Sequence, residues 1–260
     1  MRSTERFERF WHDMVLAFPW GTEVNGAVVS CYPEIPISQF NHATDIDVRE
    51  DEAENLLEVV TRHFVSKGFP DVRFRTTALT RPRSFSAFLW NHGFARSLED
   101  EESAMVFKGK NLEDKLNPKV KVKEISESEV DVYSRLLLAI FEMPFEWKKG
   151  VDAFILEIMR KGAKCYLAYV GKKPVGISGL LSFMKTGGVF NVGTLKTYRR
   201  QGIGTTLVAH TVMDSIKEGN TFHILYTEKH GNPERLYNKI GFKTDHTVVW
   251  FVKHLGKLPS

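Results

Sequence analysis

The segment that decides how this chain is interpreted is Val192-Gly193-Thr194-Leu195-Lys196-Thr197-Tyr198-Arg199-Arg200-Gln201-Gly202-Ile203-Gly204-Thr205. It ends an apolar run that predicts a β-strand (189–194) and opens an amphipathic stretch that predicts a helix to about residue 217. The two glycines that open this helix, Gly202 and Gly204, let a ligand approach the backbone closely. The start of a helix also offers unpaired N–H groups and a partial positive charge. With two adjacent arginines raising the local potential, we expect this turn to bind an anion, and specifically a pyrophosphate.

The glycine turn has three alternative interpretations: a dinucleotide-binding fingerprint, a P-loop, and close packing of a strand against a helix. The dinucleotide-binding fingerprint needs a third glycine, and Leu207 stands in its place. A P-loop needs Gly-Lys-Ser/Thr, which does not follow. A pair of glycines is also common wherever a strand and a helix pack closely, without any ligand. The pattern that fits the sequence is Arg-x-x-Gly-x-Gly, from Arg199 to Gly204.

A second motif stands further along the chain, beyond one predicted helix and one predicted strand. It reads Leu236-Tyr237-x-x-x-Gly241-Phe242. In this order and at this separation, the two motifs resemble the acyl-CoA pyrophosphate loop and the closing motif of the GNAT N-acetyltransferase superfamily. The resemblance extends over roughly residues 119–254. It implies an α+β fold in which a mixed, mostly antiparallel sheet is flanked by helices.

The resemblance also implies an activity and a binding mode. A neutral amine would attack the thioester of acetyl-CoA directly, within a ternary complex, and no metal is expected. The backbone of Val192, Gly193 and Thr194 would pair with the pantetheine arm. The pyrophosphate would be held by the loop and helix start, that is, by Arg199, Arg200, Gln201, Gly202, Ile203, Gly204 and Thr205.

Tyr237 occupies the position at which family members protonate the departing thiolate, although a core tyrosine is the alternative. Asn232 is a further candidate for cofactor contact, but it lies five residues before Tyr237, whereas the family's asparagine usually lies seven before. Because Pro233 follows it, Asn232 also fits a helix N-cap with proline at the first helical position.

The base that deprotonates the attacking amine is not fixed by the sequence. Glu228, just beyond the predicted strand 221–227, is one candidate, and Glu142 and Glu146 are others; each is also expected as a solvated surface carboxylate. His223 is expected to be packed within a strand. In the family's geometry 143–147 and 183–184 would line the acceptor site, which leaves a peptide N-terminus, a lysine, a polyamine or a drug-like amine open.

The chain is long enough for two domains, and its halves resemble one another. Residues 88–95, Phe-Leu-Trp-Asn-His-Gly-Phe-Ala, echo residues 235–243, and the order of predicted elements around them is similar. We therefore expect two tandem GNAT-like modules, with a first domain at 1–110, a linker at 111–118 and a second domain at 119–260.

The first module is expected to have lost the cofactor loop. Arg49-Glu50-Asp51-Glu52 stands where the arginine and glycine turn would lie, and its carboxylates would repel a pyrophosphate. Trp90 also replaces the tyrosine. This module is predicted to be degenerate, and to cover, scaffold or help form the substrate cleft.

Composition sets the remaining limits. The 260 residues are 42% hydrophobic and 26% charged, which is typical of a globular protein, and the net charge of +4 is spread along the chain. Nucleic-acid binding is therefore not supported, and no apolar run approaches the length of a membrane span. Cys31 and Cys165 are expected to be buried small hydrophobes.

We expect a cytoplasmic monomer or homodimer that acetylates a small-molecule or peptide amine. The alternatives are a non-catalytic acyl-CoA-binding regulatory protein and a related acyl or aminoacyl transferase.

Overall fold

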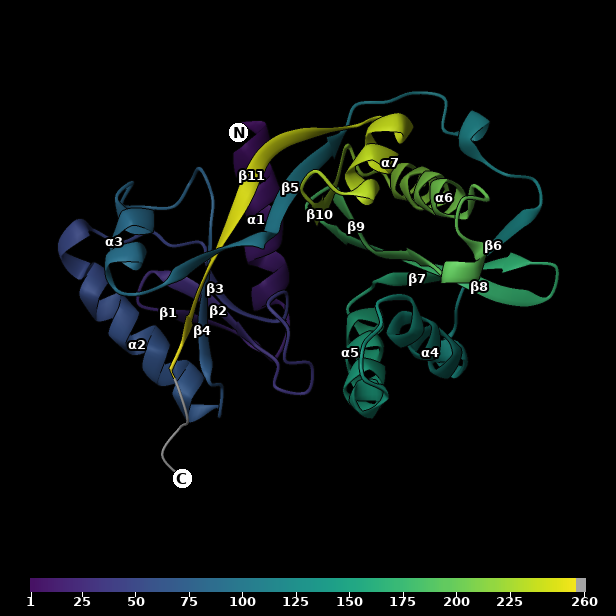
Figure 1. Ribbon diagram of the computed structural model, residues 1–260. Coiled ribbons are helices and arrows are strands. Elements are labelled where there is room, and N and C mark those ends of the chain that lie inside the picture. The colour runs from purple at the N-terminus through teal and green to yellow at the C-terminus, as the bar shows by residue number, and fades with distance from the viewer. Residues whose placement is uncertain (256–260) are drawn as a thin grey trace. The chain divides into compact units, whose positions relative to one another are not determined.

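The computed structural model describes residues 1–255, apart from the side chains of residues 98–100 (Figure 1). It consists of two compact units, which are described one at a time. The first comprises Met1–Ala104 and the chain from Asp245 onward, and the second comprises Met105–Thr244. Two strands, β5 (Ala95–Phe107) and β11 (Phe242–His254), therefore contribute residues to both units.

This division differs from the boundaries expected at 110 and 119. All of β11 falls within the expected second domain, at 119–260. It is one continuous strand of 13 residues, and from Asp245 onward it belongs to the first unit. Its last six residues pair antiparallel with β4 (Asp71–Thr76), in the register Val249↔Thr76 to His254↔Asp71. A strand's own pattern does not indicate which sheet it joins. Residues 256–260 of the expected second domain lie outside the described residues.

In the first unit the strands lie in the order β1-β2-β3-β4-β11-β5. Its other elements, in chain order, are α1 (Ser3–Leu16), β1 (Gly21–Val24), β2 (Ala27–Cys31), β3 (Asn41–Thr44), the 3-10 turn η1 (Glu50–Glu52), α2 (Ala53–Ser66) and α3 (Phe85–Asn91). The β1–β2, β2–β3 and β4–β11 pairs are antiparallel, whereas β3 and β4 are parallel neighbours through Ala43↔Phe74.

The core of the first unit lies between the sheet and the helices α2 and α3. In α2, Leu56, Val60 and Phe64 recur at helical spacing and are buried against Phe74 of β4 and Leu89 of α3. Removing each such side chain from water contributes about 1.5–3 kcal/mol. The helical spacing of these residues therefore defines the buried face of α2.

On the other side of this unit a charged network is buried. Arg75 of β4 is 1% exposed, and its Nη1 donates to Glu8 Oε2 of α1 at 2.6 Å. His246 bonds Glu8 Oε1 at 2.7 Å and Asp245 at 2.9 Å, and the Thr4 hydroxyl donates to Asp245 at 2.7 Å. Burial alone would raise the pKa of Glu8, but the charge of Arg75 and the hydrogen bonds from His246 and Arg75 lower it to about 2. Glu8 is therefore ionised at neutral pH.

In the second unit the strand order is β5-β10-β9-β8-β7-β6. Figure 1 shows α6 and α7 on one face of this sheet and α4 and α5 on the other. Its elements are η2 (Glu113–Lys115), β6 (Val120–Glu124), η3 (Glu127–Glu129), α4 (Val130–Ile140), η4 (Phe145–Trp147), α5 (Lys148–Arg160), β7 (Lys164–Val170), β8 (Lys173–Phe183), β9 (Thr186–Thr194), η5 (Lys196–Tyr198), α6 (Ile203–Lys217), β10 (Phe222–Glu228) and α7 (Asn232–Ile240).

The predicted fold class is confirmed, since the structure is α+β with a mixed, mostly antiparallel sheet flanked by helices. In the second unit the order of elements follows the predicted order from β6 through α7. Cys31 and Cys165 are both free and buried, as expected. Among the described residues, no helix is long and apolar enough to cross a bilayer.

Candidate functional site

The strands β9 and β10 are paired only at the first three residues of each strand. They pair in parallel at Phe222↔Thr186, His223↔Gly187 and Ile224↔Gly188, and the register ends there. The later part of β9 stays paired on its other side, with β8, through a bulge at which Asn191 takes a positive φ of 50°. The backbone edge of Val192–Thr194 that faces β10 is therefore open, as an extended ligand would need.

The turn after β9 has the geometry of an anion site. Arg200 (φ 65°) and Gly202 (φ 75°) are both left-handed, and Gly202 is the N-cap of α6. The N–H groups of Ile203, Gly204 and Thr205 in the first turn of this helix have no intrahelical acceptor, and they lie at the positive end of its dipole. This arrangement can hold a phosphate group without any cationic side chain.

The two arginines of the turn differ in their contacts. Arg199 Nε donates to the carbonyl oxygen of Thr194 at 3.2 Å, which ties the end of β9 to the loop, and its side chain stays exposed. Arg200 is also exposed. Both cations therefore lie at the surface beside the helix start, where they raise the potential that an anion meets.

Asn117 supports the turn from the segment that was expected to be a linker. Its Nδ2 donates to the carbonyl oxygen of Gln201 at 2.9 Å, and its backbone N–H donates to Thr206 Oγ1 at 2.9 Å. The sequence does not reveal this role of Asn117, because Asn-Pro at 117–118 is typical of a linker and carries no other signal.

Close packing does not explain the two glycines of the motif. A Cβ built on Gly204 would meet Leu236 Cδ2 at 3.4 Å and Thr194 Oγ1 at 3.8 Å, which are ordinary contacts. Gly202 is required by its positive φ, but a Cβ there would lie 3.7 Å or more from its neighbours. By contrast, a Cβ on Gly193 would lie 2.3 Å from Ile140 Cγ2, so packing alone demands that glycine. Bare backbone at Gly204 is consistent with close approach of a ligand.

Tyr237 of α7 is 6% exposed and belongs to the core cluster that joins the two diverging strands. The same cluster contains Val189 of β9 and Leu225 of β10, and the Tyr237 ring meets Phe242 edge-on at 6.1 Å. Burial raises the pKa of Tyr237 well above its usual value. Its phenol is therefore protonated at neutral pH and has a proton to donate.

Glu228 is the last residue of β10, at the end where β9 and β10 are apart, and its side chain is exposed. Asn232 is exposed as well, and it is the first residue of α7. The expected N-cap role of Asn232 is wrong by one position, because the extended residue before the helix is Gly231 and no side chain caps the helix. A purely structural account of Asn232 is therefore weaker than the sequence indicated.

The other candidate groups are placed as follows. Glu142 is exposed and ion-paired with Lys196 Nζ at 2.9 Å, and that hydrogen bond lowers its pKa, which makes it a poorer base. Glu146 is exposed within η4. His223 is buried and bonded to Ser215 Oγ at 2.9 Å, as expected of a packed histidine. Within the described residues, no cluster of three or more His, Cys, Asp or Glu side chains is arranged to hold a metal ion.

In the first unit the corresponding strand edge is occupied by its own chain. The backbone N–H of Arg81 donates to the Ile46 carbonyl at 2.9 Å, and the Arg81 carbonyl accepts from Val48 N–H at 3.4 Å. Residue 81 thus forms a parallel bridge with Asp47. Just beyond, Arg49 is ion-paired with Asp51 and Glu52. An added ligand strand has no free edge here, and no sequence pattern indicated this bridge.

Comparison with known proteins supports the same interpretation. Residues 161–244 match the model of the acetyltransferase (GNAT) domain. No curated protein sequence matches the chain. A solved structure of a GCN5-related N-acetyltransferase from Kribbella flavida is similar over 95% of this chain and 94% of its own, at 16% identity with a TM-score of 0.73. One from Sphaerobacter thermophilus is similar over 94% and 85%, at 13% identity with a TM-score of 0.68.

A tandem GNAT protein from the clavulanic acid biosynthesis pathway is also similar, over 93% of this chain and 85% of its own, at 14% identity with a TM-score of 0.64. At these identities the likeness establishes the fold. It extends over nearly the whole chain, whereas the family match covers the part that contains the loop and Tyr237.

Proposed function

We propose, from the GNAT domain in residues 161–244 and from a fold shared with tandem GNAT proteins, that this protein is an acetyl-CoA-dependent N-acetyltransferase. Its single active module would be the second unit. The observation that carries this proposal is the juxtaposition of an open strand edge at Val192–Thr194 with the glycine turn at the start of α6. An extended pantetheine arm and a pyrophosphate need these two features in this order.

The cofactor would bind mainly through backbone. The open edge of Val192, Gly193 and Thr194 offers amide partners to the pantetheine arm, in the way that a peptide adds to a sheet. The pyrophosphate would lie on the N–H groups at the start of α6, flanked by Arg199 and Arg200 with Gln201. Asn232, exposed at the start of α7, would be a further cofactor contact.

The reaction would be direct transfer. The nitrogen of a neutral amine attacks the thioester carbon, the C–N bond forms, and the C–S bond breaks as the tetrahedral intermediate collapses. Tyr237 would give its proton to the departing thiolate, and the products are an amide and free CoA thiol. Before the attack, Glu228, directly or through water, would accept the proton that the ammonium form of the acceptor must lose. The second proton, which the nitrogen loses as the amide forms, would restore the Tyr237 phenol. Its exposed position at the end of β10 supports a role for it at the mouth of the site.

The acceptor would be a small-molecule or peptide amine with an apolar body. Phe145 and Met184, from the two segments expected to line the acceptor site, are large apolar side chains that are more than half exposed. Exposed apolar side chains in such segments support recognition of an apolar group.

Each chain would bind one acyl-CoA. The first unit is a degenerate module in this proposal, because the bridge between Asp47 and Arg81 fills the edge that pantetheine would use. The carboxylates of Glu50–Glu52 stand at the start of its helix instead of a glycine turn. The first unit would then support the fold or the acceptor rather than the cofactor.

The experiment that tests the proposal is release of CoA thiol from acetyl-CoA in the presence of a panel of amines. Turnover that depends on both the amine and Tyr237 supports the enzyme. The second candidate is a non-catalytic acyl-CoA-binding regulatory protein, which the burial of Tyr237 favours. Tight acetyl-CoA binding without thiol release for any amine would point to that candidate, and no binding at all would contradict both.

A further inference from the structure

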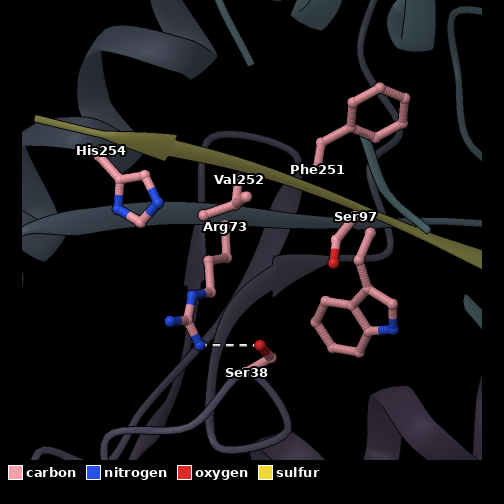
Figure 2. A pocket seen from close by; sticks show the side chains of 7 residues that line it. Ser38, Arg73, Ser97, Phe251, Val252 and His254 are labelled. Carbon is pink, nitrogen blue, oxygen red and sulfur yellow. Dashed lines mark hydrogen bonds between the residues drawn. The ribbon is translucent and has the colours of Figure 1, made fainter. Parts of the chain in front are cut away.

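A cavity of about 190 Å³ lies within the first unit, remote in sequence from the glycine turn (Figure 2). It is lined by Ser38, Arg73, Ser97, Trp250, Phe251, Val252 and His254, all of the first unit. In Figure 2 Arg73 and Ser38 point toward one another, and Phe251 lies on the far side of its strand. Because Phe251 packs in the apolar core with α2, the cavity opens on the opposite face of the sheet.

None of the described residues that line this cavity carries a carboxylate. Its titratable lining groups are Arg73 and His254. Asp71 contacts both of them, through Arg73 Nη2 at 3.0 Å and His254 Nδ1 at 2.5 Å, but it lines a separate hollow. Asp71 therefore fixes the guanidinium and the imidazole from behind. A carboxylate in the cavity would therefore meet a guanidinium that is held in place, and whose charge is partly offset, by Asp71.

The guanidinium of Arg73 has more N–H groups than the two that donate to Ser38 and Asp71. A guanidinium carries five N–H groups. One donates to Ser38 Oγ at 2.8 Å and one to Asp71, and the structure records no further bond for this side chain within the described residues. The planar fork that remains matches the two oxygens of a carboxylate.

The loop that carries Ser38 is held in place by two buried polar side chains. Asn41 Nδ2 donates to the carbonyls of Ile35 at 2.7 Å and Ile37 at 3.0 Å, and its Oδ1 accepts from the backbone of Tyr32. His42 is fully buried, and its Nδ1 bonds the Ser38 carbonyl at 2.9 Å. The donors around the cavity are thus fixed before any ligand arrives, which reduces the entropy lost on binding.

The rest of the lining is apolar and sets the size of the ligand. The indole of Trp250 is fixed by its own hydrogen bond, from Nε1 to Glu102 at 3.2 Å, and Val252 stands beside it on the same strand. A dry cavity of about 150 Å³ is enough to hold benzene, whereas drug-sized ligands need roughly 300 Å³ or more. The ligand is therefore about as large as a substituted benzene ring.

We infer that the first unit contains a binding site for a small monocarboxylate with an apolar body, in which Arg73 receives the carboxylate and Trp250 and Val252 receive the body. Ser38 adds a hydroxyl beside the guanidinium. The site is independent of the acyl-CoA site proposed for the second unit, and it gives the first unit a ligand of its own.

Binding of benzoate to the full chain tests this inference, with benzamide as the uncharged probe of equal shape. Isothermal titration should show saturable benzoate binding, and at least tenfold weaker binding of benzamide. Arg73→Met should weaken benzoate binding at least tenfold. Arg73→Lys, which keeps the charge but loses the fork, should fall between the two. The matched control is Arg62→Met, which removes an exposed arginine of α2 in the same unit and should bind benzoate like the wild type.

Thermal melting of each variant separates a lost site from a lost fold. If Arg73→Met does not fold, Ser38→Ala and Arg73→Lys decide the question in its place. The inference is overturned if benzoate does not saturate, or if benzamide binds as tightly as benzoate. It is equally overturned if a folded Arg73 variant keeps the wild-type affinity for benzoate.

Discussion

Replacing Gly204 by glutamate separates the stability of the second unit from its affinity for CoA. The Cβ of a side chain at this position meets only ordinary contacts, with Leu236 at 3.4 Å and Thr194 at 3.8 Å, and the backbone is not left-handed. A carboxylate in the first turn of a helix also stabilises it by about 0.3–1 kcal/mol. We therefore expect Gly204→Glu to fold, with a melting temperature equal to or above that of the wild type.

The affinity of this variant for CoA should fall, although its stability does not. A unit charge about 4 Å from another costs about 1 kcal/mol in water and about 4 kcal/mol at an effective dielectric constant of 20. The mutated site is partly exposed, so a loss between these limits is expected, and it corresponds to roughly a fivefold to thousandfold rise in Kd. Because a pyrophosphate carries more than one charge, we expect the Kd for CoA to rise at least tenfold.

Isothermal titration of CoA at low and high salt measures this effect, with Gly204→Ala as the matched control. The alanine variant should bind CoA within a few fold of wild type. The loss in the glutamate variant should shrink as salt screens the charges. A folded Gly204→Glu protein that binds CoA within threefold of wild type at low salt would refute the placement of the pyrophosphate.

Three further predictions follow from the two units. Tyr237→Phe should keep the fold and the CoA affinity while kcat falls about a hundredfold, the lower end for general acid catalysis, because a phenol of raised pKa is a modest acid toward a thiolate. Unchanged turnover with the best amine would remove Tyr237 from the mechanism. Titration calorimetry should find one CoA per chain, since Arg81 fills the edge in the first unit, and a second site of similar affinity would contradict this. Because the pKa of Glu8 lies below its ordinary value of 4.5, at about 2, Glu8 stabilises the fold above pH ~4.5. Urea unfolding should show that about 3 kcal/mol of the free energy of unfolding is lost as pH falls from 4.5 to 2. Glu8→Gln should be less stable than the wild type at pH 7, and its stability should lack this dependence on pH.

The parts of this fold that could be predicted are those with a local cause. The strand at 189–194 and the helix that runs to about residue 217 were predicted from their apolar patterns, and the structure has β9 (Thr186–Thr194) and α6 (Ile203–Lys217) there. The anion-binding turn was likewise visible in the sequence, because two glycines after an apolar strand constrain the backbone locally, and Gly202 indeed takes a positive φ.

What the sequence could not predict depends on contacts between distant residues. Nothing in the pattern around Arg81 indicates that its backbone pairs with residues 46–48, since backbone pairing leaves no mark on side-chain composition. Asn117 holds Gln201 across 84 positions of sequence, and its neighbour Pro118 pointed only to a linker. The destination of β11 was missed for the same reason, because β4 and β5 are joined to it by register and not by any motif.

The position of β11 also determines the order in which the two units can complete their folding during synthesis. In the first unit the strand lies between β4 and β5, yet it is the last strand to be synthesised. At 5–20 residues per second, β4 therefore waits roughly ten to forty seconds for one of its two neighbours. The second unit, Met105–Thr244, is contiguous and is complete before that neighbour emerges. The half of the protein that is made first is thus the half that finishes folding last, and during that interval the open edge of β4 is available to chaperones or to aggregation.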